Sequence, residues 1–393
     1  MCKCLKEKIY VTRPLLPSLD DVYTQLQDIW NSKWLTNNGP KHKELELKLR
    51  EYLKVDNIAM FSNGTLALEL GLKALDISGE VITTPFTFPA TVQALDRNGI
   101  TPVFCDIEDQ TLNIDANKIE EHINDKTSAI LAVHVFGNPC NVKKIQEIAD
   151  KYNLKVIYDG AHAFGSHING KSIGSYGDMT MFSFHATKLF NTIEGGGLVF
   201  KNEDLYKKLY LLKNFGIASP EEVVLSGTNA KLNEVQAAVG LEVLKVVGEE
   251  RERRKAIKKA YEEGLANIPG IRVLNKLDDE NASYQYFTIE VDENEYGMSR
   301  DELHLQFEKH NVFTRKYFYP LCSEFEWYKD LPSTKKENLP VAHEVIKKVL
   351  SMPYYGDLKI AEVNQICEII RDIYDNKVKE SIAVTTEIQD INK

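Results

Sequence analysis

The chain lacks several features that would assign it to common classes of protein. None of its apolar runs approaches the roughly 20 residues that a membrane-spanning helix needs, although hydrophobic residues make up 43% of the sequence. It contains neither G-x-G-x-x-G nor G-x-x-x-x-G-K-[ST], which excludes the nucleotide loops of Rossmann and P-loop proteins. Internal repeats and low-complexity runs are also missing. We therefore expect a globular protein that does not span a membrane.

Positive charge and cysteine are both scarce. The 48 Lys and Arg residues are outnumbered by 58 Asp and Glu residues, and the net charge of −10 argues against general nucleic-acid binding. Six cysteines are few for 393 residues, and only Cys2 and Cys4 lie close together, at a spacing that fits no common zinc site. We expect reduced thiols in a cytoplasm, with a metal at Cys2 and Cys4 as a second option. The first ten residues lack the apolar core of a secretory signal, so we expect no export.

Short apolar runs alternate with longer segments of helical period between about residues 57 and 200, a pattern that predicts an α/β sheet domain. The expected strands are 58–61, 80–83, 102–105, 129–135, 155–158, 179–182 and 198–200. The expected helices are 66–75, 90–98, 142–152 and 205–214.

Beyond residue 229 the pattern changes. Residues 232–265 predict one long helix with a densely charged second half, followed by a strand at 283–291 and helices at 300–310, near 340–350 and at 360–374. We expect a large domain over residues 20–248 and a smaller α+β domain over 249–377, with packing of residues 1–19 on the smaller domain as an option. Residues 378–393 have no apolar periodicity, and we expect them to be disordered or loosely packed.

Lys188 and Asp159 stand out among the candidate functional residues. Lys188 follows an expected strand and precedes the glycine run of EGGG, while Asp159 ends another expected strand in KVIYDG. Loops at the carboxyl ends of parallel strands are where ligands bind in such sheets. Nearer the amino terminus, Asn63, Gly64 and Thr65 precede a helix, whose first amide groups attract an anion.

These groups are the ones that pyridoxal phosphate needs. Its chemistry requires an amine, a carboxylate that keeps the pyridine nitrogen protonated, and donors for the phosphate. Taken singly, each residue has an ordinary structural explanation, because most lysines are surface charges and Asp-Gly or Asn-Gly pairs usually form turns.

Five motifs in order resemble the DegT/DnrJ/EryC1/StrS family of nucleotide-sugar aminotransferases. They are FSNGT, TPFTFPAT, YDGAHAFG, SFHATK followed by EGGG, and GTNAKLNEVQAAVGL. The resemblance runs from TRPLLPSL at Thr12 to PYY at Pro353 and leaves out only the tail. It implies an aspartate-aminotransferase-like large domain of fold-type I, with a mostly parallel mixed sheet, beside the smaller α+β domain.

The resemblance also implies a role for each matching residue. It makes Lys188 the catalytic lysine that binds the cofactor as a Schiff base and Asp159 the partner of the pyridine nitrogen. The remaining cofactor residues are the ring-facing Phe88, the phosphate ligands Gly64, Thr65 and Ser183, Asn229 from the neighbouring subunit, and His162, where many members have Gln. A homodimer with shared active sites and no metal follows from this assignment.

Because Lys188 is present where dehydratase relatives carry His, the resemblance implies transamination, with glutamate as the amino donor. HATKLFNTIEGG is most similar to members that install an amine at C4 of dTDP-4-keto-6-deoxyglucose. The expected substrate contacts are Lys33, Trp34, Arg315, Tyr317 and Tyr319. Amination at C3, dehydration and a non-catalytic regulatory role remain alternatives, and the sequence leaves the exact keto-sugar, the nucleotide and the glycan pathway open.

Overall fold

The computed structural model describes residues 5–274 and 282–391. Its helices are α1 Leu19–Ser32, α2 Pro40–Leu53, α3 Gly64–Ala74, α4 Pro89–Asp96, α5 Val142–Tyr152, α6 Leu205–Leu212, α7 Glu234–Leu265, α8 Glu293–Tyr296, α9 Arg300–Lys309, α10 Pro340–Val345 and α11 Ile360–Ile391. Its strands are β1 Ile58–Phe61, β2 Glu80–Thr83, β3 Thr101–Phe104, β4 Thr127–Val133, β5 Lys155–Asp159, β6 His167–Ile168, β7 Lys171–Ser172, β8 Met179–Ser183, β9 Gly196–Phe200, β10 Ile217–Ser219, β11 Glu222–Val223, β12 Ile271–Val273, β13 Thr288–Val291 and β14 Val349–Ser351.

The central sheet has the strand order β1-β9-β8-β5-β4-β2-β3 within the described residues. Strands β3, β2, β4, β5 and β8 pair in parallel, whereas β9 is antiparallel to both β8 and β1. The mostly parallel mixed sheet confirms the predicted α/β class. Strand β1 therefore points the same way as β8, and the carboxyl ends of β1, β2, β5 and β8 meet at one edge of the sheet.

Helices cover both faces of the sheet, because its strands are apolar on both sides. Strand β4 is buried from Ala129 to Val133, and β5 is buried from Val156 onward. On one face pack α3, α4 and α6. On the other, α5 contributes its buried Ile145 and Ile148, and α2 packs between the sheet and α7. Burial on both sides fixes the strand ends that carry the candidate site.

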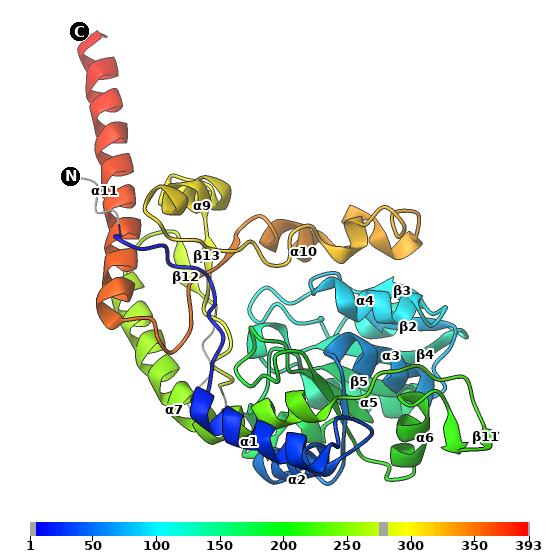
Figure 1. Cartoon of the computed structure of the whole chain (residues 1–393). Helices are drawn as coiled ribbons and strands as arrows, with labels where there is room; N and C mark the ends of the chain where they lie inside the picture. The colour runs from blue at the N-terminus through cyan, green and yellow to red at the C-terminus, as the bar shows by residue number, and fades with distance from the viewer. Residues whose placement is uncertain (1–4, 275–281, 392–393) are drawn as a thin grey trace.

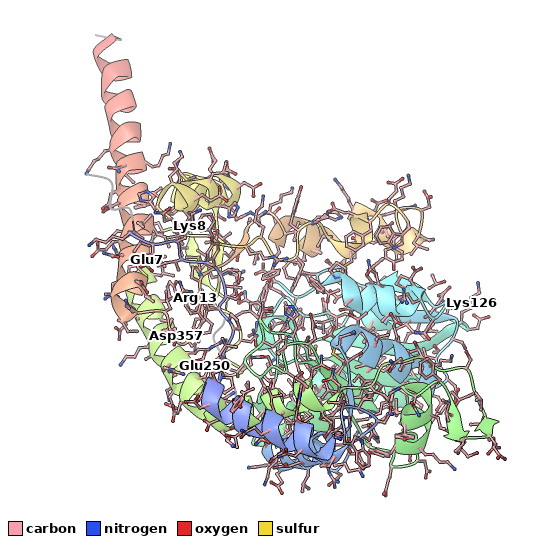
Figure 2. The ribbon with its side chains drawn as sticks, viewed as in Figure 1. Glu7, Lys8, Arg13, Lys126, Glu250 and Asp357 are labelled. Atoms are coloured by element: carbon pink, nitrogen blue, oxygen red, sulfur yellow. The ribbon has the colours of Figure 1, made fainter. Side chains whose placement is uncertain are left out.

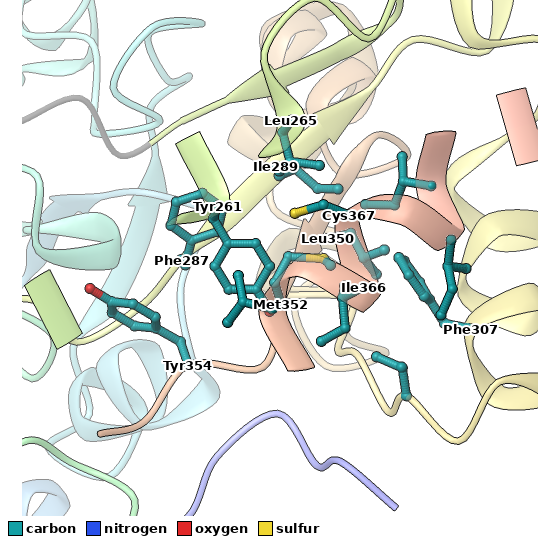
Figure 3. Packing of buried hydrophobic residues seen from close by; sticks show 14 of the residues in the cluster. Tyr261, Leu265, Phe287, Ile289, Phe307, Leu350, Met352, Tyr354, Ile366 and Cys367 are labelled. Atoms are coloured by element: carbon teal, nitrogen blue, oxygen red, sulfur yellow. The ribbon is translucent and has the colours of Figure 1, made fainter. Parts of the chain in front are cut away.

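The C-terminal part of the chain has a core of its own. Strands β12, β13 and β14 form an antiparallel sheet, and Tyr261, Phe287 and Ile366 belong to the cluster that packs with it (Figure 3). The N-terminal segment joins this part, since the Ile9 amide donates to the Asn311 carbonyl at 2.8 Å. In Figure 1 this segment runs from the neighbourhood of α9 and α11 down to α1.

Helix α7 connects the two parts of the molecule (Figure 1). It begins with a capping box, in which Asn233 accepts from the Gln236 amide and the Gln236 side chain accepts from the Asn233 amide. Its first turns pack against α1 and α2, and the helix also contacts α11. The predicted boundary between residues 248 and 249 falls inside this helix, so the division into two domains stays a prediction.

Several expected elements end at other residues than predicted. The strand expected at 283–291 begins only at Thr288, and the helix expected near 340–350 ends at Val345, before β14. Helices α1 and α2 were not predicted. The helix expected at 360–374 continues to Ile391, and the expectation that residues 378–393 are disordered or loosely packed stays a prediction. That segment contains no glycine or proline, and extending an existing helix costs far less than nucleating one.

The described residues show no helix with the length and apolar content needed to cross a membrane. Within the same ranges, no group of three His, Cys, Asp or Glu side chains is placed to hold a metal ion. Cys105, Cys140, Cys322 and Cys367 are buried free thiols. Cys2 and Cys4, the candidates for a metal site, lie outside the described residues.

Candidate active site

A cavity of about 280 Å³ opens where the carboxyl ends of β1, β2, β5 and β8 meet. Segments of the C-terminal part, around Tyr286 and from Arg315 to Phe318, form its other wall. The predicted residues that line it are Gly64, Thr65, Phe88, Asp159, His162, Ser183, Lys188, Arg315 and Tyr317. Residues from at least six separate chain segments thus converge on one site, as a parallel sheet allows.

Lys188 lies in the loop between β8 and β9, with its amide donating to the His185 carbonyl at 2.8 Å. Its Nζ donates to the Tyr286 hydroxyl at 3.3 Å. Burial of the amine lowers the pKa of Lys188 to about 8, although the neighbouring Tyr317 and Asp159 act in the opposite direction. A substantial fraction of this amine is therefore neutral at a mildly alkaline pH and can act as a nucleophile or base.

Asp159 ends β5 and is buried, with an exposed fraction of 4%. One carboxylate oxygen accepts from the Ala161 amide at 3.0 Å, and the other accepts from the Thr91 hydroxyl at 2.8 Å. Burial raises the pKa of Asp159, while these two donors and Lys188 oppose the rise. A buried carboxylate oriented in this way is suited to accept from a cationic N–H.

His162 is held as a neutral ring. Its Nδ1 accepts from the Phe136 amide at 3.3 Å, which leaves the hydrogen on Nε2. Burial lowers the pKa of His162 well below its ordinary value, and the positive charge of Lys188 adds to the effect. The ring stacks on Phe318 and meets Tyr286 edge-on, at centroid distances of 5.5 and 4.9 Å. His162 can therefore offer one hydrogen bond from a fixed position.

The turn before α3 forms an anion-binding corner. Asn63 caps the helix by accepting from the Leu66 amide at 2.8 Å, and Gly64 and Thr65 occupy the first turn, where amides have no partner within the helix. A Cβ built on Gly64 would lie 3.2 Å from the Cβ of Ser183, so the Ser183 side chain borders the same corner. These groups together suit a phosphate.

Phe88 and Arg315 mark the mouth of the cavity. Phe88 precedes α4 and is half exposed, while Arg315 is exposed and its guanidinium lies 4.7 Å from the centre of the Tyr317 ring. A cation at the mouth attracts anionic substrates without any excess of positive charge over the whole chain.

Four predicted residues do not line this cavity: Lys33, Trp34, Tyr319 and Asn229. Lys33 follows the last turn of α1, and the Trp34 indole donates to the Thr36 carbonyl at 2.7 Å. Tyr319 and Asn229 are exposed.

Sequence reasoning missed several residues of the site. Thr87 and Thr91 lie four residues apart in the TPFTFPAT motif. This spacing places two side chains on the same side of a helix, so it could have indicated that their hydroxyls are neighbours. Gln285 and Tyr286 fall inside the expected strand 283–291, and no motif there indicated that they lie near Lys188. Glu194 was visible only as part of EGGG, and it lines the cavity.

The donor set fits pyridoxal phosphate. The cavity combines an amine of lowered pKa, a buried carboxylate, a neutral imidazole, a helix start beside a serine and an exposed aromatic ring. Groups of these kinds suit the aldehyde carbon, the pyridine nitrogen, the phenolic oxygen, the phosphate and the ring face of that cofactor.

The chain is similar to known aminotransferases along most of its length. Residues 20–371 match the DegT/DnrJ/EryC1/StrS aminotransferase family. A dTDP-4-amino-4,6-dideoxy-D-glucose transaminase of Escherichia coli is 45% identical over 365 residues, which cover 92% of this chain and 98% of the relative. A transaminase of the same name from Shigella dysenteriae is 42% identical, over 94% of this chain and all of the relative.

Solved structures of sugar aminotransferases have the same fold. The structure of DesI with its TDP-sugar product has a TM-score of 0.90 and 33% identity, over 97% of this chain and 96% of the other. Helicobacter pylori PseC, an aminotransferase of pseudoaminic acid biosynthesis, has a TM-score of 0.87 and 27% identity, over 94% of this chain and 100% of the other.

Proposed function

The chain belongs to the DegT/DnrJ/EryC1/StrS aminotransferase family, and we propose that it aminates C4 of dTDP-4-keto-6-deoxyglucose to give dTDP-4-amino-4,6-dideoxyglucose. The main support for amination at C4 is the 45% identity, over nearly the whole chain, to a transaminase named for that product. The cavity that Lys188 shares with Asp159 and the phosphate corner supports the proposal. Glutamate is the proposed amino donor.

Pyridoxal phosphate is the proposed cofactor, held by Lys188, Asp159, His162, Phe88 and the corner formed by Gly64, Thr65 and Ser183. When bound, it supplies a ring that accepts electron density from the carbon losing its proton. Asp159 keeps the pyridine nitrogen protonated, and the neutral His162 donates to the phenolic oxygen. The α3 amides and Ser183 bind the phosphate.

Lys188 is the proposed acid and base of the reaction. Its free amine takes a proton from the α-carbon of glutamate and later delivers a proton to C4 of the sugar. The low pKa of the amine, about 8, allows both steps near neutral pH. Arg315 is placed to pair with the diphosphate of the nucleotide sugar or with a carboxylate of glutamate.

A homodimer would complete the site. Lys33, Trp34, Tyr319 and Asn229 are exposed and lie outside the cavity of their own chain, so we propose that they serve a neighbouring subunit or the nucleotide end of the substrate. Such an interface would cover apolar side chains that are exposed in the single chain. They include Trp30, Leu35, Phe215, Val223 and Val224.

The decisive experiment is product analysis with the full-length enzyme, pyridoxal phosphate, glutamate and dTDP-4-keto-6-deoxyglucose. Mass spectrometry should detect an amino sugar, and NMR should place the amine on C4. Lys188→Ala should form no product. Lys126→Ala should match the parent enzyme, because Lys126 is exposed and directly precedes the amino end of β4 (Figure 2). Amination at C3, dehydration or the absence of any product would contradict the proposal. The predicted cytoplasmic location stays a prediction.

A further inference from the structure

The segment Ser283 to Tyr286 approaches Lys188 from the C-terminal part of the chain. Gln285 contacts the peptide groups on both sides of the lysine: its Oε1 accepts from the Leu189 amide at 2.5 Å, and its Nε2 donates to the Thr187 carbonyl at 3.0 Å. Gln285 has an exposed fraction of only 3%. Its amide therefore fixes the backbone that carries Lys188, and a buried amide with both ends paired has a single orientation.

Tyr286 contacts the reacting nitrogen itself. The Lys188 amine donates to the Tyr286 hydroxyl at 3.3 Å and lies 5.5 Å from the centre of its ring. The ring is held in turn by His162, which it meets at 4.9 Å, and by Phe136 at 5.6 Å. The Tyr286 hydroxyl also has a hydrogen bond with Tyr317. The oxygen that accepts from Lys188 is thus fixed on several sides.

We propose that Tyr286 is a further catalytic residue, which orients the free Lys188 amine for proton transfer while Gln285 positions the lysine backbone. The inference rests on the proposed aminotransferase chemistry. One N–H of Lys188 is donated to the Tyr286 oxygen, so the lone pair of the neutral amine points away from Tyr286. The amine takes up a proton from a substrate carbon to become an ammonium, and the same proton leaves for the accepting carbon. Tyr286 itself neither gains nor loses a proton.

The surroundings of Lys188 fit this division of roles. The titratable and charged groups that face it are Asp159, His162, Tyr286, Arg315 and Tyr317. Burial raises the pKa of Tyr286 to about 12, which keeps its hydroxyl protonated at working pH. His162 is neutral, and Asp159 is engaged by Thr91 and Ala161. The Tyr286 hydroxyl is the hydrogen-bond partner of the Lys188 Nζ within the described part of the chain.

Tyr286→Phe tests the proposal by removing one oxygen and keeping the ring. Because the hydroxyl stabilises the charged ammonium, its loss should lower the pKa of Lys188 by about one unit. We would measure that pKa from the pH dependence of Lys188 acetylation, followed by mass spectrometry of the full-length protein loaded with pyridoxamine phosphate. The kcat should fall about tenfold while both KM values stay within about twofold.

Tyr261→Phe is the matched control. Tyr261 is also buried, but its hydroxyl donates to the Pro353 carbonyl in the C-terminal core at 3.0 Å. This control should leave the acetylation midpoint and kcat at the parent values. Gln285→Glu is a second variant: it loses the donor to the Thr187 carbonyl and should lower kcat even where Tyr286→Phe folds poorly.

An unchanged acetylation midpoint together with an unchanged kcat in Tyr286→Phe would overturn the proposal. An equal fall in the Tyr261→Phe control would also overturn it, since the effect would then be one of stability. Failure of the proposed function has a different signature, namely a parent enzyme that forms no amino sugar. The pH midpoint of Lys188 acetylation would still test the contact between Tyr286 and Lys188 in that case, because the acetylation measurement needs no turnover.

Discussion

Two threonines orient the buried carboxylate of Asp159. Thr91 donates its single hydroxyl proton to Asp159 at 2.8 Å, so the hydrogen bond of 2.8 Å between the Thr87 and Thr91 hydroxyls is donated by Thr87. All three side chains are buried. This relay favours the ionised carboxylate and opposes the effect of burial, which raises the pKa of Asp159.

Thr91→Val should weaken cofactor binding. Valine has a similar shape but no donor, so the pKa of Asp159 should rise further. Its charged form, which we propose binds the pyridinium, should become less populated. We expect the Kd for pyridoxal phosphate to rise about tenfold at pH 7, with recovery as pH increases. Absorbance titration at several pH values measures this. Thr180→Val, which removes a buried hydroxyl bonded to the Tyr176 carbonyl, is the control. An unchanged Kd across the pH range would refute the role of Thr91.

Lys213 is a second buried lysine, outside the candidate site. Its Nζ donates to the Met60 carbonyl at 3.0 Å and lies 5.5 Å from the centre of the Phe61 ring. Burial lowers the pKa of Lys213 from the ordinary 10.5 to about 8. Below pH 8 the lysine is charged in both the folded and the unfolded chain, and the folded state bears the full cost of burying that charge.

The stability contributed by Lys213 should depend on pH with a definite sign. Between about pH 8 and 10.5 the unfolded chain binds more protons at this residue, so the free energy of unfolding rises with pH, by about 3 kcal/mol in total. Lys213→Met removes this dependence. The Tm of the parent minus the Tm of the variant should therefore increase as the pH is raised from 7 to 9.5, and melting curves measure this difference. A constant difference in Tm over that range would show that Lys213 is not buried as a charge.

At the scale of elements, the strands of the central sheet could be predicted and several helices could not. Short apolar runs bounded by turns marked β1, β2, β5 and β8 to within one residue, because each is buried on both faces. Helices α1 and α2 carry mixed polar sequences, and α2 buries only one stripe that includes Leu45 and Leu49. Their helical state depends on packing against α7, which the sequence alone does not contain.

The part of the site on the sheet could be predicted, and the part on the C-terminal segments only in outline. Lys188, Asp159 and the turn at Gly64 carry their chemistry in local motifs at strand ends. Gln285 and Tyr286 reach the site through tertiary contact with a segment about a hundred residues away. The alternation of residues 283–291 predicted a strand, but β13 begins only at Thr288, and Gln285 and Tyr286 instead contact the loop that contains Lys188.

Strand β9 supports the phosphate corner through Gly196. A Cβ on Gly196 would lie 2.6 Å from the Asn63 carbonyl carbon and 2.6 Å from the Gly64 amide nitrogen, both backbone atoms. The middle of the EGGG motif is thus a close approach between β9 and the start of α3, not a nucleotide loop. Any side chain at residue 196 has to displace the turn that we propose binds the phosphate.

Gly196→Ala should therefore weaken both the binding of pyridoxal phosphate and the stability of the fold. The displaced turn should raise the Kd for pyridoxal phosphate about tenfold or more and lower stability by about 1–3 kcal/mol. Gly248→Ala is the matched control, since a Cβ there meets nothing within 4 Å and alanine favours the helix α7 that contains it. Binding titrations and melting curves distinguish the two effects. Parent-like affinity in Gly196→Ala would mean that β9 does not set the geometry of the corner.

At the scale of the whole molecule, a buried ion pair ties α7 to the wall of the cavity. Arg254 pairs with Glu250 at 2.6 Å and donates to the Tyr284 carbonyl at 3.1 Å, one residue before Gln285. Glu250 also accepts from the Gly356 amide at 2.8 Å. Because a buried charge without its partner is costly, this network holds the segment that reaches Lys188 in one arrangement.

The proposed active site also includes a residue of a second subunit. Asn229 is exposed in its own chain, and its backbone pairs with Asn214 near the exposed loop that contains Phe215. Lys188 lies in the cavity. If Asn229 serves the neighbouring subunit, each active site of a dimer takes Lys188 from one chain and Asn229 from the other. A two-fold interface makes this exchange reciprocal.

Mixed dimers can test this exchange. Lys188→Ala and Asn229→Ala chains carrying different tags are co-expressed, and dimers that bear both tags are purified. With Asn229 acting across the interface, one site of each mixed dimer carries both substitutions and the other is intact, so activity at limiting pyridoxal phosphate should be about half that of the parent. The Lys188→Ala dimer should be inactive and the Asn229→Ala dimer weak. If Asn229 instead serves its own chain, neither site of the mixed dimer is intact, and its activity should not exceed half that of the Asn229→Ala dimer. That outcome would confine each active site to a single subunit.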